Sequence, residues 1–588
     1  MRDPRISLSA INDGSAFDVV VVGAGGAGLS AALSAAIKGA RVLIVERTGW
    51  VGGTTAFSAG TTWVPGNHHG KRLNPNDTLT AAARYLDLSV GDRSSAQLRQ
   101  AFLDNGARVV EDLEAQTELK YRPYAKHPDY ISDLDGATLN GRALEPLPFD
   151  GRLLGALFGL LRPPIPEFTV LGGMMVDRND VNHLLGMRRS VQSFKHAMGL
   201  LWRHACDRVR YPRGTRLVMG NALVARLLYS LAQQPRVSLL LNASLQQIHL
   251  ADGEVQAVTL LQAEQTLTLQ VRGGLVLASG GFNRHPGLRG HFMPGVSADW
   301  CPGAPGHTGQ AHDLARKAGA IYGAAGLSPA YWAPVSLRQR ADGSLAVFPH
   351  FVMDRAKPGM LTVNQAGQRF VNESTSYHLF ALAMQAQPAQ PEAAPAYLVC
   401  DARALKAYGL GMVRPGAADL GAYLADGYLS RGATLQQLAS QLGIDGQALQ
   451  STVARFNTQA MAAKDSDFHR GTTAYERNLG DPAWGGDNPN LGPLLEAPFY
   501  AVKLYPGDIG AATGFMTDAH AQVLGDRGEA LSGLYAVGND MHSIMGGVYP
   551  APGITLGPGL VFGYLAAEHA VARAKSNAMG TQASRPAA

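Results

Sequence analysis

Short apolar runs recur along this chain at spacings that are typical of the strands of a parallel sheet. Residues 18–22 (DVVVV) and 41–45 (RVLIV) flank a segment of small residues, LSAALSAAIKG, which has the character of a helix. Continuous β-branched runs of this length indicate strands that are buried on both faces. Comparable runs follow at residues 237–241, 275–278 and 533–537. The pattern predicts an α/β fold with a Rossmann-like sheet that takes strands from both ends of the chain.

The pattern changes in the middle of the chain. Residues 291–490 contain loops, aromatic residues and short amphipathic segments such as Thr434–Leu442. A chain of 588 residues is expected to form more than one domain. We therefore predict a discontinuous nucleotide-binding domain over residues 1–290 and 491–588, interrupted by an α+β substrate domain over residues 291–490.

The first apolar run leads directly into GAGGAG, which fits the spacing G-x-G-x-x-G. Gly23 allows a tight turn, Gly25 lets a diphosphate approach the following helix, and Gly28 lets helix and strand pack closely. Glu46 ends the second run, 18 positions after Gly28, where a carboxylate can accept a hydrogen bond from a ribose hydroxyl. Strand, turn, helix, strand and acid in this order predict a dinucleotide site, and the glycine spacing alone fits both NAD and FAD.

Other small-residue segments are placed to complete this site. The loop Val51–Gly60 follows Glu46, and the turns SGG and GND follow the runs that end near residues 278 and 537. Loops of this kind let backbone approach a diphosphate and a flat ring. The further residues expected to contact the cofactor are Gly26, Arg47, Gly53, Thr54, Thr55, Ser58, Gly60, Leu245, Ala278, Gly280, Gly538, Asn539 and Leu556.

Glycine and proline are dense near the C-terminus, in the segment Tyr549–Gly559. These residues favour an extended loop that can approach a flat ligand. A helix that begins near Gly557 directs its free N–H groups, and the positive end of its dipole, toward that ligand. The hydroxyl of Tyr549 and the N–H of Gly553 can meet on one carbonyl oxygen. This loop predicts carbonyl chemistry beside the dinucleotide site.

Composition excludes several classes of function. The three cysteines, Cys206, Cys301 and Cys400, lie far apart, so neither a disulfide framework nor a thiolate metal site is predicted, and no metal is expected. The chain start has no secretory pattern, and no run of about 18 apolar residues predicts a membrane-spanning helix. Nucleic-acid binding is not expected either, because few aromatic residues lie among the cations. We expect a cytoplasmic protein.

Residues 150–216 combine apolar and basic character. Residues 153–161 read LLGALFGLL, and Phe194, Met198 and Leu201 recur at helical spacing. Residues 178–216 contain nine Lys or Arg and two Asp, a net charge of +7 against +5 for the whole chain. Basic residues beside apolar ones suit an anionic bilayer, which predicts peripheral attachment to the inner face of the cell membrane. A solvated helical hairpin or an oligomer contact remains an alternative.

Several segments together carry a family resemblance. GAGGAG with Glu46, VGGTTAFSAGTTWVPGN, LASGGF, RFVNES, FHRG and YAVGND resemble the flavoprotein family of soluble fumarate reductases and 3-ketosteroid dehydrogenases. Three segments resemble the 3-ketosteroid Δ1-dehydrogenases in particular. His127–Tyr130 is similar to an F-P-D-Y segment, Asn372–Tyr377 to N-E-S-x-x-Y, and Tyr549–Gly553 to Y-P-x-P-G. His127 departs from the aromatic residue of the family, and residues 150–216 and the tails lie outside the resemblance.

The resemblance implies an FAD-dependent 1,2-desaturation of 3-oxo-4-ene steroids. The substrate would include sterols with a side chain, such as cholest-4-en-3-one, because the insert is similar to that of the dehydrogenases that accept them. Tyr549 and Gly553 would hold the C3 ketone, and Tyr377, assisted by Tyr130, would take the C2 proton while flavin N5 takes a hydride from C1. The FAD would be held non-covalently, because the segment around Thr54 offers no histidine for a flavin link. A quinone-like molecule or an artificial dye would reoxidise it.

The base raises a physical problem. A phenol with a pKa of about 10 is a poor base at neutral pH, so its surroundings must lower that pKa. The residues do not indicate which charge does so.

Three alternatives stay open at this point. A fumarate- or urocanate-type reductase needs cationic clamps, yet no arginine lies between Arg527 and Arg573. A steroid Δ4-dehydrogenase also polarises a 3-ketone. A non-catalytic lipid carrier with a flavoprotein fold is the third, and the intact glycine motif argues against it.

Overall fold

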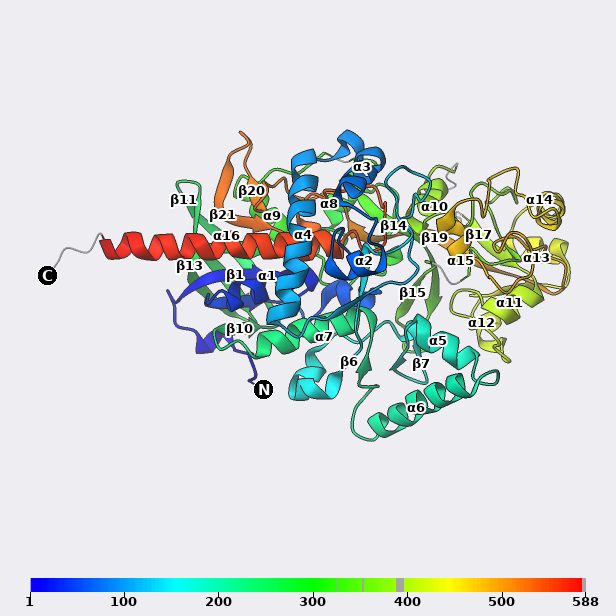
Figure 1. The fold of residues 1–588 in the computed structure, drawn as a ribbon, viewed down its shortest axis with the longest axis horizontal. Coiled ribbons are helices and arrows are strands. Elements are labelled where there is room, and N and C mark those ends of the chain that lie inside the picture. The colour runs from blue at the N-terminus through cyan, green and yellow to red at the C-terminus, as the bar shows by residue number, and fades with distance from the viewer. Residues whose placement is uncertain (1, 325, 352–353, 388–395, 584–588) are drawn as a thin grey trace.

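The computed structural model describes residues 2–324, 326–351, 354–387 and 396–583. Figure 1 shows two sheet-containing regions, one around β1 and β13 and one around β14 and β19, with the long C-terminal helix α16 running across the first.

The larger sheet has eight strands in the order β10-β2-β1-β13-β12-β21-β20, and β11 pairs with β12. Its centre is parallel, with Val19 of β1 opposite Val42 of β2 and Val20 opposite Leu275 of β13. The bounds are Ala16–Val22 (β1), Val42–Val45 (β2), Val237–Leu240 (β10), Ala243–Ala251 (β11), Glu254–Gln262 (β12), Gln265–Leu277 (β13), Gln522–Leu524 (β20) and Ala530–Ala536 (β21). The five predicted strands are confirmed, and they come from both ends of the chain.

Helices cover this sheet. α1 (Gly26–Ile37) packs against α16 (Leu556–Ala583) and against α7 (Met219–Ala232), and α4 (Ala96–Gln116) packs on α16. The buried residues of α1 are mostly Ala, Gly and Ser. Residues of this size let the neighbouring helices approach closely. The Rossmann-like arrangement therefore brings the start of α1 and the start of α16 to the same end of the sheet.

The second sheet is antiparallel and has six strands in the order β15-β14-β19-β17-β16, with β18 paired to β19. The bounds are Ala330–Gln339 (β14), Leu345–Pro349 (β15), Met360–Val363 (β16), Ala396–Cys400 (β17), Ser430–Gly432 (β18) and Phe499–Ala511 (β19). The predicted division at residue 490 does not follow this sheet, because β19 pairs with β14 and β17 rather than with the parallel strands. The apolar pattern of β19 alone does not reveal its partner.

Within the apolar and basic insert, the helical part lies at the lower edge in Figure 1. The apolar run at residues 153–161 instead packs largely into the main core, where Leu154, Leu157 and Phe158 are buried, so most of this run is not available to a membrane as the insert stands. The elements of the insert are the 3-10 segment Gly151–Leu160 (η4) and the helices Arg178–Leu185 (α5) and Val191–Arg208 (α6). The buried Asp180 carboxylate of α5 connects this helix to α6 and to the end of the insert, because it contacts His196 at 2.8 Å and Arg216 at 2.6 Å. The predicted helix through Phe194 and Met198 is confirmed. Within the described parts of the chain, no helix has the length and apolar character needed to cross a bilayer.

Candidate active site

The glycine motif forms the turn between β1 and α1, and two of its glycines are sterically required. Gly23 has a φ of +112°, and a Cβ at this residue would lie 2.1 Å from the carbonyl oxygen of Ala278. A Cβ at Gly28 would lie 2.0 Å from the carbonyl oxygen of Gly23. A Cβ at Gly25 would meet no atom within 4 Å. The turn is thus closed against the sheet and open at Gly25, as diphosphate binding requires.

The loop after β2 lies against this turn. A Cβ at Gly53 would lie 3.5 Å from Gly25 Cα, and Thr55 Oγ1 accepts a hydrogen bond of 3.0 Å from the N–H of Gly26. The loop is stiffened from within, since Ser58 Oγ donates to the carbonyl of Thr55 at 2.8 Å. Ser58 Oγ also accepts from Gly60 N. These predicted cofactor residues are therefore brought together at the start of α1.

Two further predicted residues meet at the end of β13. Thr54 Oγ1 accepts from the N–H of Ala304 at 2.9 Å and lies 3.3 Å from His307 Nε2. Gly280 has a φ of +94°, and a Cβ there would lie 2.6 Å from the same His307 nitrogen. His307 is a neighbour that the sequence did not single out.

Glu46 is held beside the glycine turn. Its Oε2 accepts from the N–H of Ala24 at 2.9 Å, and its Oε1 accepts from the N–H and hydroxyl of Thr48 at 2.9 and 2.8 Å. Arg47 is exposed next to it, and Leu245 is buried on the neighbouring strand β11. These positions suit the adenosine half of a dinucleotide, and their individual contacts with it remain predictions.

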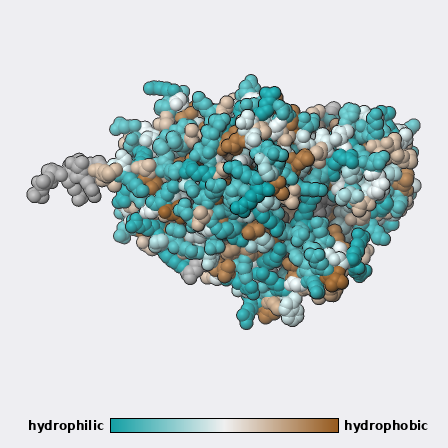
Figure 2. Space-filling view, in the orientation of Figure 1, coloured by the Kyte–Doolittle hydropathy of each residue, from teal (hydrophilic) through white to brown (hydrophobic). Residues whose placement is uncertain are grey.

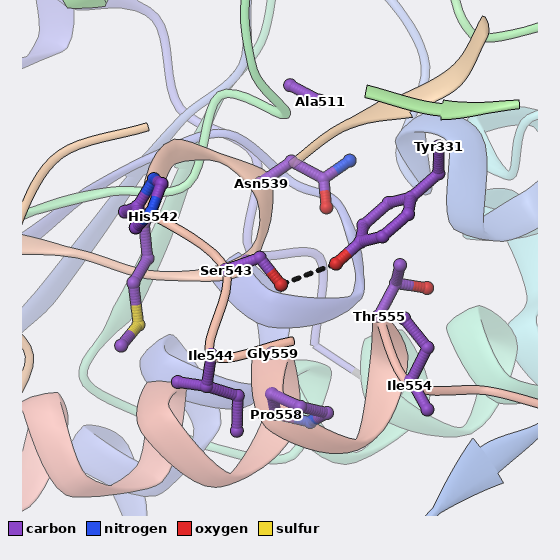
Figure 3. Close-up of a pocket in the computed structure, with 12 residues that line it drawn as sticks. Tyr331, Ala511, Asn539, His542, Ser543, Ile544, Ile554, Thr555, Pro558 and Gly559 are labelled. Carbon is purple, nitrogen blue, oxygen red and sulfur yellow. Dashed lines mark hydrogen bonds between the residues drawn. The ribbon is translucent and has the colours of Figure 1, made fainter. Parts of the chain in front are cut away.

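The start of α16 meets the turn after β21. A Cβ at Gly538 would lie 2.9 Å from Ala27 Cβ, and a Cβ at Gly559 would lie 3.6 Å from Gly538 Cα. Asn539 lines a small pocket at this point. Figure 3 shows its side chain facing Tyr331, whose hydroxyl is hydrogen-bonded to Ser543. The other residues that line the pocket are Ala511, Gly538, Met541, His542, Ile544, Ile554, Thr555, Pro558 and Gly559.

Beside this pocket the fold assembles three predicted tyrosines. Tyr130 Oη donates to Tyr377 Oη at 3.3 Å. The ring centroid of Tyr549 lies 5.1 Å from that of Tyr377 and 5.7 Å from that of Tyr130. All three side chains are buried. Tyr377 is the first residue of helix α10 (Tyr377–Gln385), which the Ser376 side chain caps. Three distant segments thus form one cluster.

The backbone of the C-terminal loop is fixed by neighbours of the cluster. The Pro550 carbonyl accepts from the N–H of Tyr130 at 2.7 Å and from the hydroxyl of Tyr85 at 2.6 Å. These bonds hold Tyr549 against Tyr130.

Gly553 is positioned by the strand β3 (Thr62–Trp63). It has a φ of +88°, its carbonyl accepts from Trp63 N at 3.2 Å, and a Cβ would lie 2.4 Å from the Thr61 carbonyl oxygen. Among the hydrogen bonds of the described residues, none uses the Gly553 N–H as donor. Only glycine suits this position, and its N–H can still donate a hydrogen bond to a ligand oxygen.

Burial dominates the electrostatics of the cluster. Burial, with neighbouring phenols, raises the pKa of Tyr377 and Tyr130 well above 10, and burial also raises the pKa of Tyr549. All three are neutral phenols at pH 7. Burial lowers the pKa of His127 to about 3, so its imidazole is neutral too, which fits a wall of the site rather than a base.

Sequence reasoning missed further aromatic neighbours of the cluster. The ring of Tyr475 lies 4.7 Å from Tyr130, that of Phe351 4.9 Å from Tyr377, and that of Tyr331 5.1 Å from Tyr549. None of the three was among the predicted site residues, and only the packing identifies them.

One group of potential metal ligands lies elsewhere. His68, His69 and Glu114 place one ligand atom each within 4.8 Å of one another, on α2 (His68–Leu73) and α4. His69 Nε2 and Glu114 Oε2 are 2.9 Å apart, which is an ordinary hydrogen bond. This group includes none of the predicted site residues, and the expected absence of a metal remains a prediction.

Comparison with known proteins identifies the family to which the chain belongs. A family model described as FAD binding domain matches residues 18–556. The chain is 36% identical to 4-oxocyclohex-2-ene-1-carboxylate 5-dehydrogenase of Sinomonas cyclohexanicum, over 97% of this chain and 96% of that one. It is 34% identical to 3-oxosteroid 1-dehydrogenase of Mycolicibacterium smegmatis, over 96% and 99%.

A solved structure agrees with these relatives. The 3-ketosteroid delta1-dehydrogenase of Sterolibacterium denitrificans, in complex with 1,4-androstadiene-3,17-dione, superimposes with a TM-score of 0.87 at 32% identity, covering 95% of this chain and 100% of that one. The open space at Gly25 and the carboxylate of Glu46 beside the glycine turn fit the diphosphate and the adenosine of FAD. The chain belongs to the FAD binding domain family, and its cofactor is FAD.

Proposed function

We propose that this protein catalyses the FAD-dependent 1,2-desaturation of 3-oxo-4-ene steroids. The observation that supports this best is the convergence of Tyr549, Gly553 and the Tyr377–Tyr130 pair beside the start of α16. The relatives that are named for ketone dehydrogenation cover nearly the whole chain. Abstraction of hydrogens next to a ketone requires a carbonyl clamp, a base and a hydride acceptor, and this site has a candidate for each.

Tyr549 and Gly553 form the carbonyl clamp. The phenol and the backbone N–H each donate to the C3 oxygen, which gains negative charge as the C2 proton leaves. One such preorganised donor is worth about 3–4 kcal/mol of the barrier. Among the hydrogen bonds of the described residues none uses the Gly553 N–H, so this donor stays available for the substrate.

Tyr377 is the base. In its ionised form it takes the C2 proton, and the electron pair of that C–H bond moves toward the ring to form the C1–C2 double bond. Tyr130 donates to the Tyr377 oxygen, and a donated hydrogen bond can stabilise a phenolate, although burial and the neighbouring phenols raise the pKa of Tyr377 before the substrate binds. FAD held at the glycine turn would supply the hydride acceptor for C1, and we expect a quinone-like molecule to take the two electrons from it afterwards. Proton and hydride together account for the two-electron oxidation.

Anaerobic incubation of the purified holoprotein with androst-4-ene-3,17-dione and an artificial acceptor tests the proposal. Mass and NMR analysis of the product should show a new 1,2 double bond. A 4,5-desaturated product from a saturated 3-ketosteroid, with no 1,2 product, would assign the Δ4 reaction instead.

We also propose that the insert docks on an anionic bilayer, from which lipophilic sterols such as cholest-4-en-3-one reach the site. α6 exposes an apolar stripe at helical spacing, in which the exposed fractions of Val191 and Trp202 are both 73%. Figure 2 shows hydrophobic residues among hydrophilic ones at the lower edge, where α6 lies. The apolar residues exposed on α5, α6 and the turn after them are Leu185, Val191, Phe194, Met198, Trp202 and Val209.

The basic residues divide into two groups. Arg213 is buried, Arg203 pairs with Asp150 at 2.9 Å, and Arg216 pairs with Asp180. These cations hold the insert together. The cations exposed beside the stripe are Arg188, Arg189, Lys195, Arg208 and Arg210. Each contributes about 1 kcal/mol near an anionic surface, and the stripe supplies the apolar contact.

Vesicle binding tests the docking surface. Phe194→Ser with Trp202→Ser should reduce co-sedimentation with phosphatidylglycerol vesicles several-fold, while turnover of a water-soluble steroid stays unchanged. Met461→Ser is the matched control, because Met461 is 67% exposed on α14 (Gly446–Met461) outside the insert. Unchanged co-sedimentation of the double variant would reject the surface. Faster turnover of cholest-4-en-3-one than of androst-4-ene-3,17-dione would support the side-chain preference.

A carboxylated ring ketone is the second candidate substrate. The observation that favours it is the 36% identity to the Sinomonas cyclohexanicum dehydrogenase. Both reactions oxidise a carbon pair beside a ring ketone, but a carboxylate requires a cation to recognise it. The ratio of kcat/KM for 4-oxocyclohex-2-ene-1-carboxylate and androst-4-ene-3,17-dione discriminates between the two.

A further inference from the structure

Two histidines and a glutamate from separate helices converge on one point outside the tyrosine cluster. His68 and His69 begin α2, and Glu114 lies near the end of α4. Glu114 Oε2 lies 2.9 Å from His69 Nε2 and 3.3 Å from His68 Nε2. The centroids of the two imidazole rings are 3.9 Å apart. One carboxylate oxygen therefore faces two ring nitrogens at once.

These separations suit a divalent transition metal. A tetrahedral zinc ion with bonds of about 2.0–2.1 Å holds its ligand atoms about 3.3 Å apart. The two distances from Glu114 Oε2 are close to this spacing, and all three ligand atoms lie within 4.8 Å of one another. Two imidazoles with one carboxylate form a ligand set that favours zinc over magnesium and calcium, which prefer oxygen ligands alone.

Hydrogen bonds within the cluster leave the ring of His68 incompletely satisfied. Among the described residues, its buried Nδ1 has no hydrogen-bond partner, although buried polar atoms normally have one. The carboxylate of Glu111, which shares a face of α4 with Glu114, lies 3.8 Å from this nitrogen. The Glu111 side chain is 53% exposed, so it can turn to accept from Nδ1–H. A histidine that binds a metal usually donates its other ring N–H to a carboxylate in this way.

The surroundings hold the three side chains in place. Asn67 caps α2, because its Oδ1 accepts from the N–H of Gly70 at 2.7 Å. Glu114 Oε1 accepts from the N–H of Tyr121 at 2.8 Å, which leaves Oε2 for the histidines. The Glu114 side chain is only 11% exposed, so its charge is largely removed from water and favours a bound cation. The ligand set is therefore formed before any ion binds.

We propose that His68, His69 and Glu114 form a zinc site that links α2 to α4, with water as the fourth ligand. α2 follows β3, whose Trp63 N–H donates to the carbonyl of Gly553, and α4 packs on α16. Zinc at this point stabilises the layer that supports the C-terminal loop. The cysteine count could not predict the site, because its ligands are imidazoles and a carboxylate that lies 45 residues after His69.

Zinc titration of the purified FAD-containing protein, after dialysis against a chelator, tests the site without any steroid. Calorimetry should show one zinc ion per chain, with magnesium bound at least about 100-fold more weakly. His69→Gln and Glu114→Gln should each weaken zinc binding by about 100-fold or more, and Glu111→Gln by about tenfold. His285→Gln is the matched control, because His285 Nε2 also lies 2.9 Å from a carboxylate oxygen, that of Asp313, and the described residues supply no third ligand there.

Thermal unfolding adds a second readout. Saturating zinc should raise the midpoint of the wild type and of His285→Gln by a few degrees, because a ligand that binds only the folded state stabilises it. It should leave the midpoint of Glu114→Gln unchanged, while flavin absorbance confirms that each protein is folded. Unchanged zinc affinity in His69→Gln or Glu114→Gln, an equal loss in His285→Gln, or equal affinity for magnesium would overturn the proposal.

X-ray absorption at the zinc edge needs no variant. One equivalent of zinc on the wild-type holoprotein should give nitrogen and oxygen ligands at about 2.0–2.1 Å, with outer-shell scattering from two imidazoles. A spectrum without imidazole scattering, or a wild-type protein that does not bind zinc, would overturn the proposal even if the variants do not fold.

Discussion

The glycine turn after β1 and the tyrosine cluster would serve the same proposed reaction, but they are built in opposite ways. The turn is defined by backbone contacts, in which Gly23 and Gly28 allow β1, α1 and the end of β13 to touch. The cluster is defined by side chains that arrive from the segments around Tyr130, Tyr377 and Tyr549. The comparison shows that the cofactor cradle, by which we mean the glycine turn Gly23–Gly28, can be a local property of the chain. The proposed reacting groups instead depend on the whole fold.

A substitution in the cradle should have the largest effect, because it should prevent FAD from binding. Gly28→Ala places a methyl group 2.0 Å from the Gly23 carbonyl oxygen, and relief requires the strand and helix to separate. We expect a colourless protein without flavin absorbance and a lowered thermal midpoint. Gly199→Ala in α6 is the control, because a Cβ there meets no atom within 4 Å. A yellow, fully stable Gly28→Ala protein would show that the turn does not act as described.

Substitutions in the tyrosine cluster should lower activity while FAD stays bound at the cradle. Tyr377→Phe and Tyr549→Phe should each lower kcat by about 10²- to 10⁴-fold, because a base or a carbonyl donor is removed. Both proteins should remain yellow. Tyr408→Phe removes a hydroxyl bonded to Asp481 outside the cluster and should keep its activity. Full activity in either cluster variant would reject the role assigned to that phenol.

The two regions should also differ in pH dependence. Burial raises the pKa of Tyr377, so its neutral form predominates at low pH and the reactive phenolate increases as the pH rises. The rate of flavin reduction should therefore rise about tenfold per pH unit until the apparent pKa is reached. Flavin content should stay constant, since the cradle contacts are mainly backbone. His127 and His378, with pKa values lowered by burial to about 3 and about 4, stay neutral throughout this range. A rate independent of pH would contradict a phenol base.

The smallest effect on chemistry should come from the insert. Asp180→Asn breaks the contacts with His196 and Arg216 that hold α5 and α6 together. The pKa of Asp180 is lowered by hydrogen bonds and by Arg216 against the opposing effect of burial. Its stabilisation is therefore present above the unfolded pKa and is lost as the pH falls through the folded one. We expect a thermal midpoint lower by a few degrees at pH 7, a smaller difference in acid, and unchanged turnover of a soluble steroid. Loss of that turnover would link the insert to catalysis.

Much of the parallel sheet could be predicted from the sequence. The β-branched runs locate β1, β2, β10 and β21 to within a few residues, and of β13 they locate only the C-terminal end, because strands buried on both faces must be continuously apolar. The turn residues Gly23 and Gly28 follow from the same local logic. The assignment of β19 to the antiparallel sheet could not be predicted, since its partners β14 and β17 lie about 100 residues or more away in the chain.

The sequence by itself determined the cradle, the start of α16 and the position of Glu46, because backbone sterics and hydrophobic periodicity act over short stretches of chain. It also named Tyr549 through its loop, and Tyr130 and Tyr377 only through resemblance. The tertiary structure alone decided that Tyr475, Phe351 and Tyr331 surround them. Packing between distant segments sets the burial, and burial sets both the pKa of a phenol and the reach of a charge.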